Sequence, residues 1–166
     1  MPPADEEQRM PVIRTSLWFD TLALEAAEYY VSIFPNSKIT DVSYWGAENS
    51  ERKGSPLEVL FELDGRQFSA INGGPDFTFD EAVSIQVYCA DQAELDRYWD
   101  ALSAGGRQVQ CGWLTDRYGL SWQVIPNQLA ALMTDPDPER VLRAKRAMHT
   151  MVKLDIAALE AAADGR

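Results

Sequence analysis

The sequence has few of the residues that build secreted, metal-rich or membrane proteins. Its 166 residues include two cysteines and one histidine. Cys89 and Cys111 are too few for a disulfide-stapled secreted scaffold and too far apart for a CxxC redox or zinc motif. No run approaches the roughly 20 apolar residues of a membrane span, and the acidic stretch of residues 1–10 lacks the apolar run of a signal peptide. We therefore expect a cytoplasmic protein with reduced thiols.

Basic residues are also scarce. The chain has 15 Lys and Arg against 26 Asp and Glu, a formal net charge of −11. Nucleic acids and anionic membranes both need a concentrated basic face, so we expect neither as a partner. Apolar types nevertheless make up 46% of the residues, which is typical of a globular chain that buries a sizeable core.

The first half of the chain predicts the order βαβββ after a disordered leader, residues 1–11. Strands have an alternating pattern and the helix has a 3.6-residue pattern. The strongest hairpin signal is Asp64-Gly65, and the polar segment Gly46–Ser55 suits a mobile loop. The predicted elements are a strand at Val12–Asp20, a helix at Glu25–Phe34, and strands at Lys38–Trp45, Pro56–Leu63 and Arg66–Asn72.

The second half predicts βαββ, with room for one more short strand. Asp91 and Glu94 form a capping box at the helix start, and Gly105-Gly106 ends the helix. The predicted strands are Val83–Ala90, Arg107–Thr115 and Leu120–Ile125, and a helical tail follows at Gln128–Thr134, Pro138–Lys153 and Asp155–Ala163.

The two halves echo each other in spacing. Thr15 in the first strand precedes Tyr30 in the helix by 15 residues, and Ser84 precedes Trp99 by the same number. Together with the matching order of elements, this indicates a duplicated module. We predict modules at residues 12–75 and 76–126 and a tail at 127–166, within one domain overall.

Three segments resemble the PhnB-like family of the vicinal-oxygen-chelate (glyoxalase/bleomycin resistance/dioxygenase) superfamily, a family often labelled 3-demethylubiquinone-9 3-methyltransferase-like. The third segment is the most specific, because Trp113, Gly119 and Trp122 rarely occur together by chance. The resemblance extends over about residues 12–163, including Lys153–Ile156. The three segments are Leu17–Asp20 with Glu25–Tyr30, Phe68–Pro75, and Cys111–Pro126.

The resemblance implies an α+β fold, in which paired βαβββ modules form a barrel-like sheet around a cavity, and a homodimer. Metalloenzymes of this superfamily hold a divalent ion on inward-facing strand positions. Those positions fall here on Thr15 or Ser16, on Ser84 and on Gln123, and none is a strong metal ligand. The single histidine, His149, lies in the helical tail. We expect neither a metal nor a cofactor.

The expected cavity combines polar and aromatic side chains, as a small-molecule site does. The face of the first strand is set by whether Thr15 or Ser16 points inward, and burial of Leu17 and Phe19 under the helix favours Ser16 and Trp18. Alternatively, Gln86 and Gln123 simply hydrogen-bond each other inside a filled barrel. The predicted ligand-binding residues are Ser16, Trp18, Ser84, Gln86, Tyr88, Trp113 and Gln123.

The leading functional hypothesis is a small-molecule-binding protein of unknown reaction. A metal-dependent enzyme or a methyltransferase is one alternative, and a non-enzymatic, ligand-sequestering or structural dimer is another. Asp20, Asp116 and Glu62 are the candidate acids, although Asp116 fits a turn better than a catalytic base. Neither Gly73-Gly74 nor Gly105-Gly106 lies in the strand-to-helix turn that normally binds a nucleotide-like methyl donor.

Overall fold

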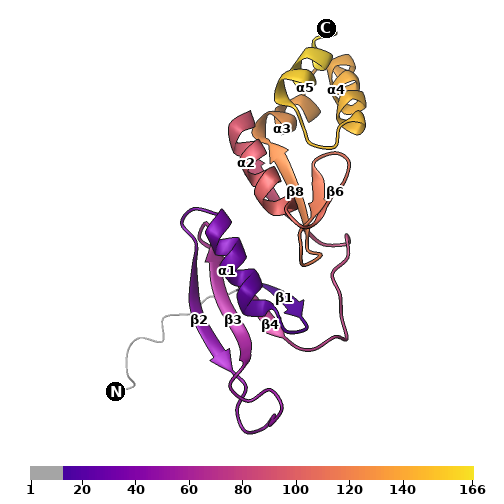
Figure 1. The fold of residues 1–166 in the computed structure, drawn as a ribbon. Coiled ribbons are helices and arrows are strands. Elements are labelled where there is room, and N and C mark those ends of the chain that lie inside the picture. Colours follow the sequence, from indigo (N-terminus) through magenta and orange to yellow (C-terminus); the bar gives the residue numbers. More distant parts are fainter. Residues whose placement is uncertain (1–12) are drawn as a thin grey trace, which may run out of the picture. The chain divides into compact units, whose positions relative to one another are not determined.

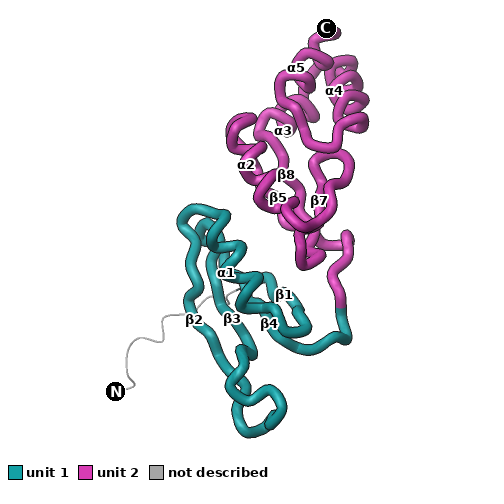
Figure 2. The backbone as a smooth tube through the Cα atoms, in the orientation of Figure 1, with its two compact units in different colours: residues 1–77 teal, residues 78–166 magenta. Residues whose placement is uncertain are grey.

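The computed structural model describes residues 13–166, which form two compact units divided between Phe77 and Thr78 (Figure 2). We call them the first unit and the second unit. The predicted leader, residues 1–11, and Val12, the first residue of the first predicted strand, lie outside the described residues. No helix within residues 13–166 is long and apolar enough to cross a membrane.

The first unit has the predicted order βαβββ (Figure 1). In its four-stranded sheet, ordered β1-β4-β3-β2, β1 and β4 are parallel and the other neighbours are antiparallel. Asp64 and Gly65 both have positive φ, 46° and 77°, as a two-residue type I′ hairpin requires. The elements are β1 (Thr15–Phe19), α1 (Ala23–Ile33), β2 (Lys38–Tyr44), β3 (Pro56–Leu63) and β4 (Arg66–Asn72).

One face of this sheet is buried under α1. Leu17 and Phe19 are 5% and 6% exposed, and they alternate with Ser16 and Trp18 on the opposite face. On the helix side, Phe61 stacks on Tyr30, with ring centroids 6.4 Å apart. The expectation that Leu17 and Phe19 pack under the helix is therefore confirmed.

The second unit repeats this topology. Its sheet has the order β5-β8-β7-β6, again with a parallel first pair, so the duplicated module is confirmed at the level of topology. At the start of α2, Asp91 accepts a hydrogen bond from the Glu94 amide at 2.9 Å, and Glu94 in turn accepts one from the Ala90 amide at 2.7 Å. The elements are β5 (Ser84–Cys89), α2 (Gln92–Ser103), β6 (Arg107–Gln108), β7 (Trp113–Thr115) and β8 (Ser121–Pro126).

The predicted strand Arg107–Thr115 is wrong as a single element. Cys111 and Gly112 have φ values of 60° and 80°, which no strand accommodates, so the segment folds into a hairpin of β6 and β7. The two amides at this turn donate to the carbonyl oxygens of Met151 and Val152, at 2.8 and 2.9 Å. The tail therefore satisfies the backbone that the break in the strand exposes.

The tail forms three helices that pack together in the second unit (Figure 1). They are α3 (Asn127–Met133), α4 (Pro138–Thr150) and α5 (Ile156–Ala163), close to the predicted ranges. Gln92 of α2 joins the tail to the sheet module, because its side chain donates to the Leu154 carbonyl and accepts from the Ile156 amide, at 3.2 and 2.9 Å.

The fold is α+β with paired βαβββ modules, as predicted. The described residues form two separate four-stranded sheets, and no strand pairing closes them into one barrel. The equal 15-residue spacing, however, does not align equivalent faces. Thr15 shares the helix side of its sheet with Phe68, whereas Ser84 lies on the side away from α2.

Candidate functional site

Five of the seven predicted ligand-binding residues lie together on the face of the second sheet that points away from α2. We call this the open face. Strand pairing aligns Gln86 with Gln123, and Gln123 with Trp113. Ser84 and Tyr88 lie two residues to either side of Gln86 on β5, so strand alternation places them on the same face.

A chain of hydrogen bonds runs along this face. The Gln123 amide donates to the Ser84 hydroxyl at 2.8 Å, and the Gln86 amide donates to the Gln123 carbonyl oxygen at 3.3 Å. The Tyr88 hydroxyl donates to the Gln86 carbonyl oxygen at 3.2 Å. The sequence also allowed Gln86 and Gln123 simply to hydrogen-bond each other inside a filled barrel. That hydrogen bond is present.

None of these five side chains carries a formal charge. Gln86 is exposed and Tyr88 is 55% exposed. Ser84, Trp113 and Gln123 are half-buried. A cation, Arg107, lies on the same side of the sheet, because it pairs with Thr115 across the strands. Its guanidinium is engaged by Glu81 at 2.7 Å, so the open face is polar and aromatic rather than ionic.

The other two predicted residues, Ser16 and Trp18, lie on the face of the first sheet that points away from α1. Trp18 is held locally, because its indole nitrogen donates to the Gly74 carbonyl at 2.9 Å. Its ring also fills the space where Gly73 lacks a side chain, since a Cβ there would lie 2.1 Å from the ring. This packing gives Trp18 a structural role in the first unit.

The residues at the superfamily's metal positions do not fit a divalent ion. Ser84 and Gln123 bond to each other, and the Thr15 hydroxyl accepts from Arg66 at 3.4 Å. Hydroxyl and amide groups are weak ligands beside imidazole and carboxylate. Within the described residues, no three His, Cys, Asp or Glu side chains gather as a metal site, and His149 is exposed in the last turn of α4.

The candidate acids have structural or solvent-facing positions. Asp116 is 2% exposed, and its carboxylate accepts from the Tyr118 and Leu120 amides and from the Trp122 indole at 2.8–3.1 Å. Its predicted turn-stabilising role is therefore confirmed. Asp20 is exposed, and Glu62 pairs with Lys38 at 3.7 Å.

Cys89 is not a ready nucleophile. The side chain is fully buried, and burial, followed by the nearby charge of Glu94, raises the pKa of the thiol to about 12. Because the thiolate is the reactive form, this residue is inert at neutral pH.

Neither glycine pair fits a nucleotide-like methyl donor. Gly73-Gly74 follows β4 and leads into an irregular segment, whereas Gly105-Gly106 follows the end of α2. Such donors are normally bound where a glycine-rich turn joins a parallel strand to the start of a helix.

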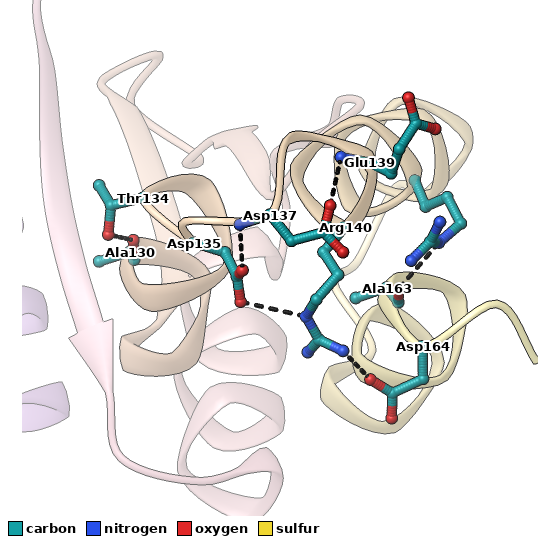
Figure 3. Close-up of polar contacts among 9 residues, drawn as sticks. Ala130, Thr134, Asp135, Asp137, Glu139, Arg140, Ala163 and Asp164 are labelled. Atoms are coloured by element: carbon teal, nitrogen blue, oxygen red, sulfur yellow. Dashed lines mark hydrogen bonds and ion pairs between the residues drawn. The ribbon is translucent and has the colours of Figure 1, made fainter.

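A groove of about 320 Å³ lies within the helical tail. Arg140 on its wall bridges Asp135 and Asp164 (Figure 3). The pKa of Asp164 lies below its ordinary value because Arg140, and then Arg166, hydrogen-bond to its carboxylate. With these charges already paired, the groove is explained by helix packing.

Sequence reasoning missed one residue of the first unit, Arg52. It lies in the segment predicted as a mobile loop, yet its guanidinium donates to the Asn72 carbonyl at the end of β4, at 3.3 Å. The sequence signal was limited to a cation between Gly46 and Gly54, and no local pattern predicts a contact across 20 residues.

The comparisons with known proteins agree on family and fold. The model of the family "3-demethylubiquinone-9 3-methyltransferase" matches residues 11–125, so the match does not extend through the tail. The PhnB protein of Bacillus cereus is 31% identical over 69% of this chain and 98% of its own, with a TM-score of 0.64. No curated protein matches.

Two more distant structures share the fold. Protein PA1353 of Pseudomonas aeruginosa is 21% identical, covers 70% of this chain and 98% of its own, and has a TM-score of 0.60. The fosfomycin resistance protein FosX of Listeria monocytogenes is 15% identical, covers 73% and 94%, and has a TM-score of 0.50. At these identities the likeness concerns the fold alone.

Proposed function

Because the chain belongs to the 3-demethylubiquinone-9 3-methyltransferase family, the PhnB-like branch of the glyoxalase superfamily, we propose that it binds a small, uncharged, oxygen-rich organic molecule on the open face. The observation that carries this proposal is the hydrogen-bonded row of Ser84, Gln123, Gln86 and Tyr88. An exposed row of this kind presents groups to a ligand without presenting a charge.

The row retains hydrogen-bonding capacity. Each glutamine amide has two N–H groups, and one of each is used within the row. The Ser84 hydroxyl accepts from Gln123 and still has its own proton to donate. Free donors suit the carbonyl or hydroxyl oxygens of a ligand, while the rings of Tyr88 and Trp113 supply apolar contact. A charged ligand would find no counter-ion among these five residues.

A thermal-shift screen tests the proposal. One panel holds quinones, hydroxy-ketones and other oxygenated metabolites, and a second holds divalent metals and the methyl donor. A ligand at 100 times its Kd adds about 2.7 kcal/mol of stability. We expect stabilisation in the first panel that is lost in the Gln86→Leu and Gln123→Leu variants.

Gln67→Leu is the matched control, because Gln67 is an exposed strand glutamine of the first unit. Stabilisation that persists in both open-face variants would refute the site. Stabilisation by a metal or by the methyl donor alone would favour the enzyme alternatives. Silence across both panels would favour a structural protein.

We also propose the homodimer that the family resemblance implies. Light scattering coupled to size-exclusion chromatography measures the mass directly. A mass of one 18.6 kDa chain at micromolar concentration would contradict the dimer without touching the ligand proposal.

A further inference from the structure

The loop between β2 and β3 carries Arg52, whose guanidinium group contacts the end of β4. The loop is closed at its base, where the Trp45 amide donates to the Ser55 carbonyl at 2.9 Å and the Gly54 amide donates to the Trp45 carbonyl at 2.8 Å. Within it, the Arg52 amide donates to the Asn49 side chain at 3.2 Å. These bonds hold together the base of the loop, the segment for which the sequence predicted mobility.

The Arg52 side chain folds back over the end of β4. Its Nη1 donates to the Asn72 carbonyl at 3.3 Å, and the guanidinium lies 5.9 Å from the centre of the Trp45 ring. None of the ion pairs among residues 13–166 involves Arg52. In a chain with 26 acidic and 15 basic residues, a half-buried arginine with no carboxylate partner is unexpected.

Aromatic rings flank the same stretch of backbone. Gly74 accepts the indole hydrogen bond of Trp18 and lies beside Arg52, whose Nη2 would be 3.3 Å from a Cβ at this glycine. Phe77 meets Trp18 edge to face, with centroids 5.0 Å apart, and is 65% exposed. In addition, the indole nitrogen of Trp45 is buried without a hydrogen-bond partner in the described structure.

We propose that Arg52 is the anchor of a second binding site, for an oxyanion carried by a small molecule with an aromatic or apolar body. The shared chemistry is a carboxylate or a phosphate group, which accepts two parallel hydrogen bonds from the planar guanidinium fork. Among residues 13–166 the Arg52 guanidinium donates one hydrogen bond, to the Asn72 carbonyl, and its remaining N–H groups can donate to the anion. Trp18 and Phe77 provide ring surface for the body of the ligand.

Gly74 allows Arg52 to lie close against the backbone that follows β4. Its φ of 108° belongs to a backbone region that residues with a side chain rarely adopt. A side chain here would press against Nη2 of Arg52, at 3.3 Å from its Cβ. This site lies wholly in the first unit, so it is independent of the open face and of the function proposed above.

The indole N–H signals of the five tryptophans report on binding in a two-dimensional NMR titration. The ligands are sodium benzoate, phenyl phosphate, inorganic phosphate and, as the uncharged control, benzyl alcohol. Trp45→Phe and Trp18→Phe identify the two relevant signals. We expect both signals to shift with at least one oxyanion and neither to shift with benzyl alcohol.

Three variants test the role of the guanidinium. Arg52→Gln should weaken binding about tenfold or more, because a charge-assisted hydrogen bond is lost. Arg52→Lys keeps the charge without the fork and should bind with intermediate affinity. Lys53→Gln removes the same charge from the neighbouring exposed residue and should bind within about twofold of the parent, as an exposed charge adds little.

The titration separates the sources of the anion. A response to benzoate assigns a carboxylate, and a response to phenyl phosphate or inorganic phosphate assigns a phosphate. The proposal is overturned if no oxyanion shifts either signal, if benzyl alcohol shifts them equally, or if Arg52→Gln binds as well as Lys53→Gln. The backbone amide signals of α1 and its sheet, in the same unit as Arg52, show that each variant is folded.

Discussion

The two modules share one topology but begin their helices in different ways. In the first unit, α1 has no side-chain cap from its own N-cap residue, Leu22. Instead Asn72, at the end of β4, accepts from the Ala23 amide at 2.8 Å. In the second unit, α2 is capped locally by Asp91 and Glu94. A repeated fold can thus keep a helix start while exchanging a long-range contact for a local one.

The strand-to-helix connections also differ by one residue. Three residues separate Phe19 from Ala23, and two separate Cys89 from Gln92. Counted from the end of each strand, Trp18 corresponds to Tyr88 and Ser16 to Gln86. The equal spacing noted in the sequence measures strand start to helix instead, so it matches residues on opposite faces. In β structure a shift of one residue reverses every side chain.

The largest difference between the modules should appear at their closest backbone approaches. A Cβ at Gly106 would lie 2.0 Å from the Thr115 carbonyl oxygen, whereas one at Gly73 meets the Trp18 ring. Backbone yields less than a side chain, so Gly106→Ala should lower the free energy of unfolding by about 3 kcal/mol or more and Gly73→Ala by about 1–3 kcal/mol. Urea denaturation measures both.

Gly46→Ala is the control for this pair, because its Cβ would meet only the flexible end of the Glu48 side chain. We expect a change within about 0.5 kcal/mol. A loss at Gly73 as large as that at Gly106 would show that Trp18 is as rigidly held as the backbone.

The exchange of helix caps gives the second prediction. Asn72 is 4% exposed, and it also donates to the Pro56 carbonyl at 2.9 Å. Asn72→Ala should lower the free energy of unfolding by about 2–3 kcal/mol, because the buried Ala23 amide loses its hydrogen-bond acceptor. Asp91→Ala removes an exposed cap and should cost about 1 kcal/mol. Equal losses in thermal unfolding would mean that the long-range cap is no stronger than the local one.

The tail distinguishes the second unit, and Gln92 tests how firmly it is attached. Gln92→Ala removes the hydrogen bonds to Leu154 and Ile156, and about 1–2 kcal/mol should be lost. Gln108→Ala, at an exposed strand position, is the matched control. Hydrogen exchange of the Cys111 and Gly112 amides should accelerate in the first variant only. Unchanged exchange would place the attachment elsewhere.

The smallest expected effect concerns the ion pair between Asp96 and Lys153, 2.8 Å apart. The pKa of Asp96 lies below its ordinary 3.8 because Lys153, and then Gln92, hydrogen-bond to the carboxylate. The stability that the ion pair adds to the folded protein is fully present above pH 3.8. It is lost as the pH falls through the lowered pKa of Asp96. The pKa of Lys153 is raised above 10.5 mainly by Asp96, so the pair persists up to that pH.

Asp96→Asn should therefore destabilise the protein at neutral pH and hardly at all in strong acid. Both side chains are about 40% exposed (42% and 39%), so solvent screening keeps the effect below about 1 kcal/mol. Urea denaturation across the acid range measures it. If the difference in unfolding free energy between the parent and Asp96→Asn grew as the pH fell, the stabilising role of the Asp96–Lys153 ion pair would be contradicted.

The elements were predictable wherever the signal is local. The Asp64-Gly65 turn, the Asp91 cap and the alternation of β5 all depend on neighbouring residues. The break in the Arg107–Thr115 strand was not predictable, because the groups that satisfy it, the Met151 and Val152 carbonyls, lie about 40 residues later. The contact between Arg52 and Asn72 was not predictable either, because the two residues are 20 positions apart in the sequence.

For the candidate site, alternation predicted that Ser84, Gln86 and Tyr88 share a face, and strand pairing adds Gln123 and Trp113 to it. Sequence could not supply the direction of each hydrogen bond. It also could not predict that Trp18 packs on Gly73, because that contact depends on a close approach between β1 and the segment after β4.

The contact between the hairpin turn and the tail bears on how the protein is made. A ribosome releases the chain from the N-terminus, so Cys111 and Gly112 emerge long before Met151 and Val152, whose carbonyls their amides need. Until then the turn has only water as a partner. The second module therefore matures only when Met151 and Val152 arrive, and a chain cut before them should be a ready substrate for proteases.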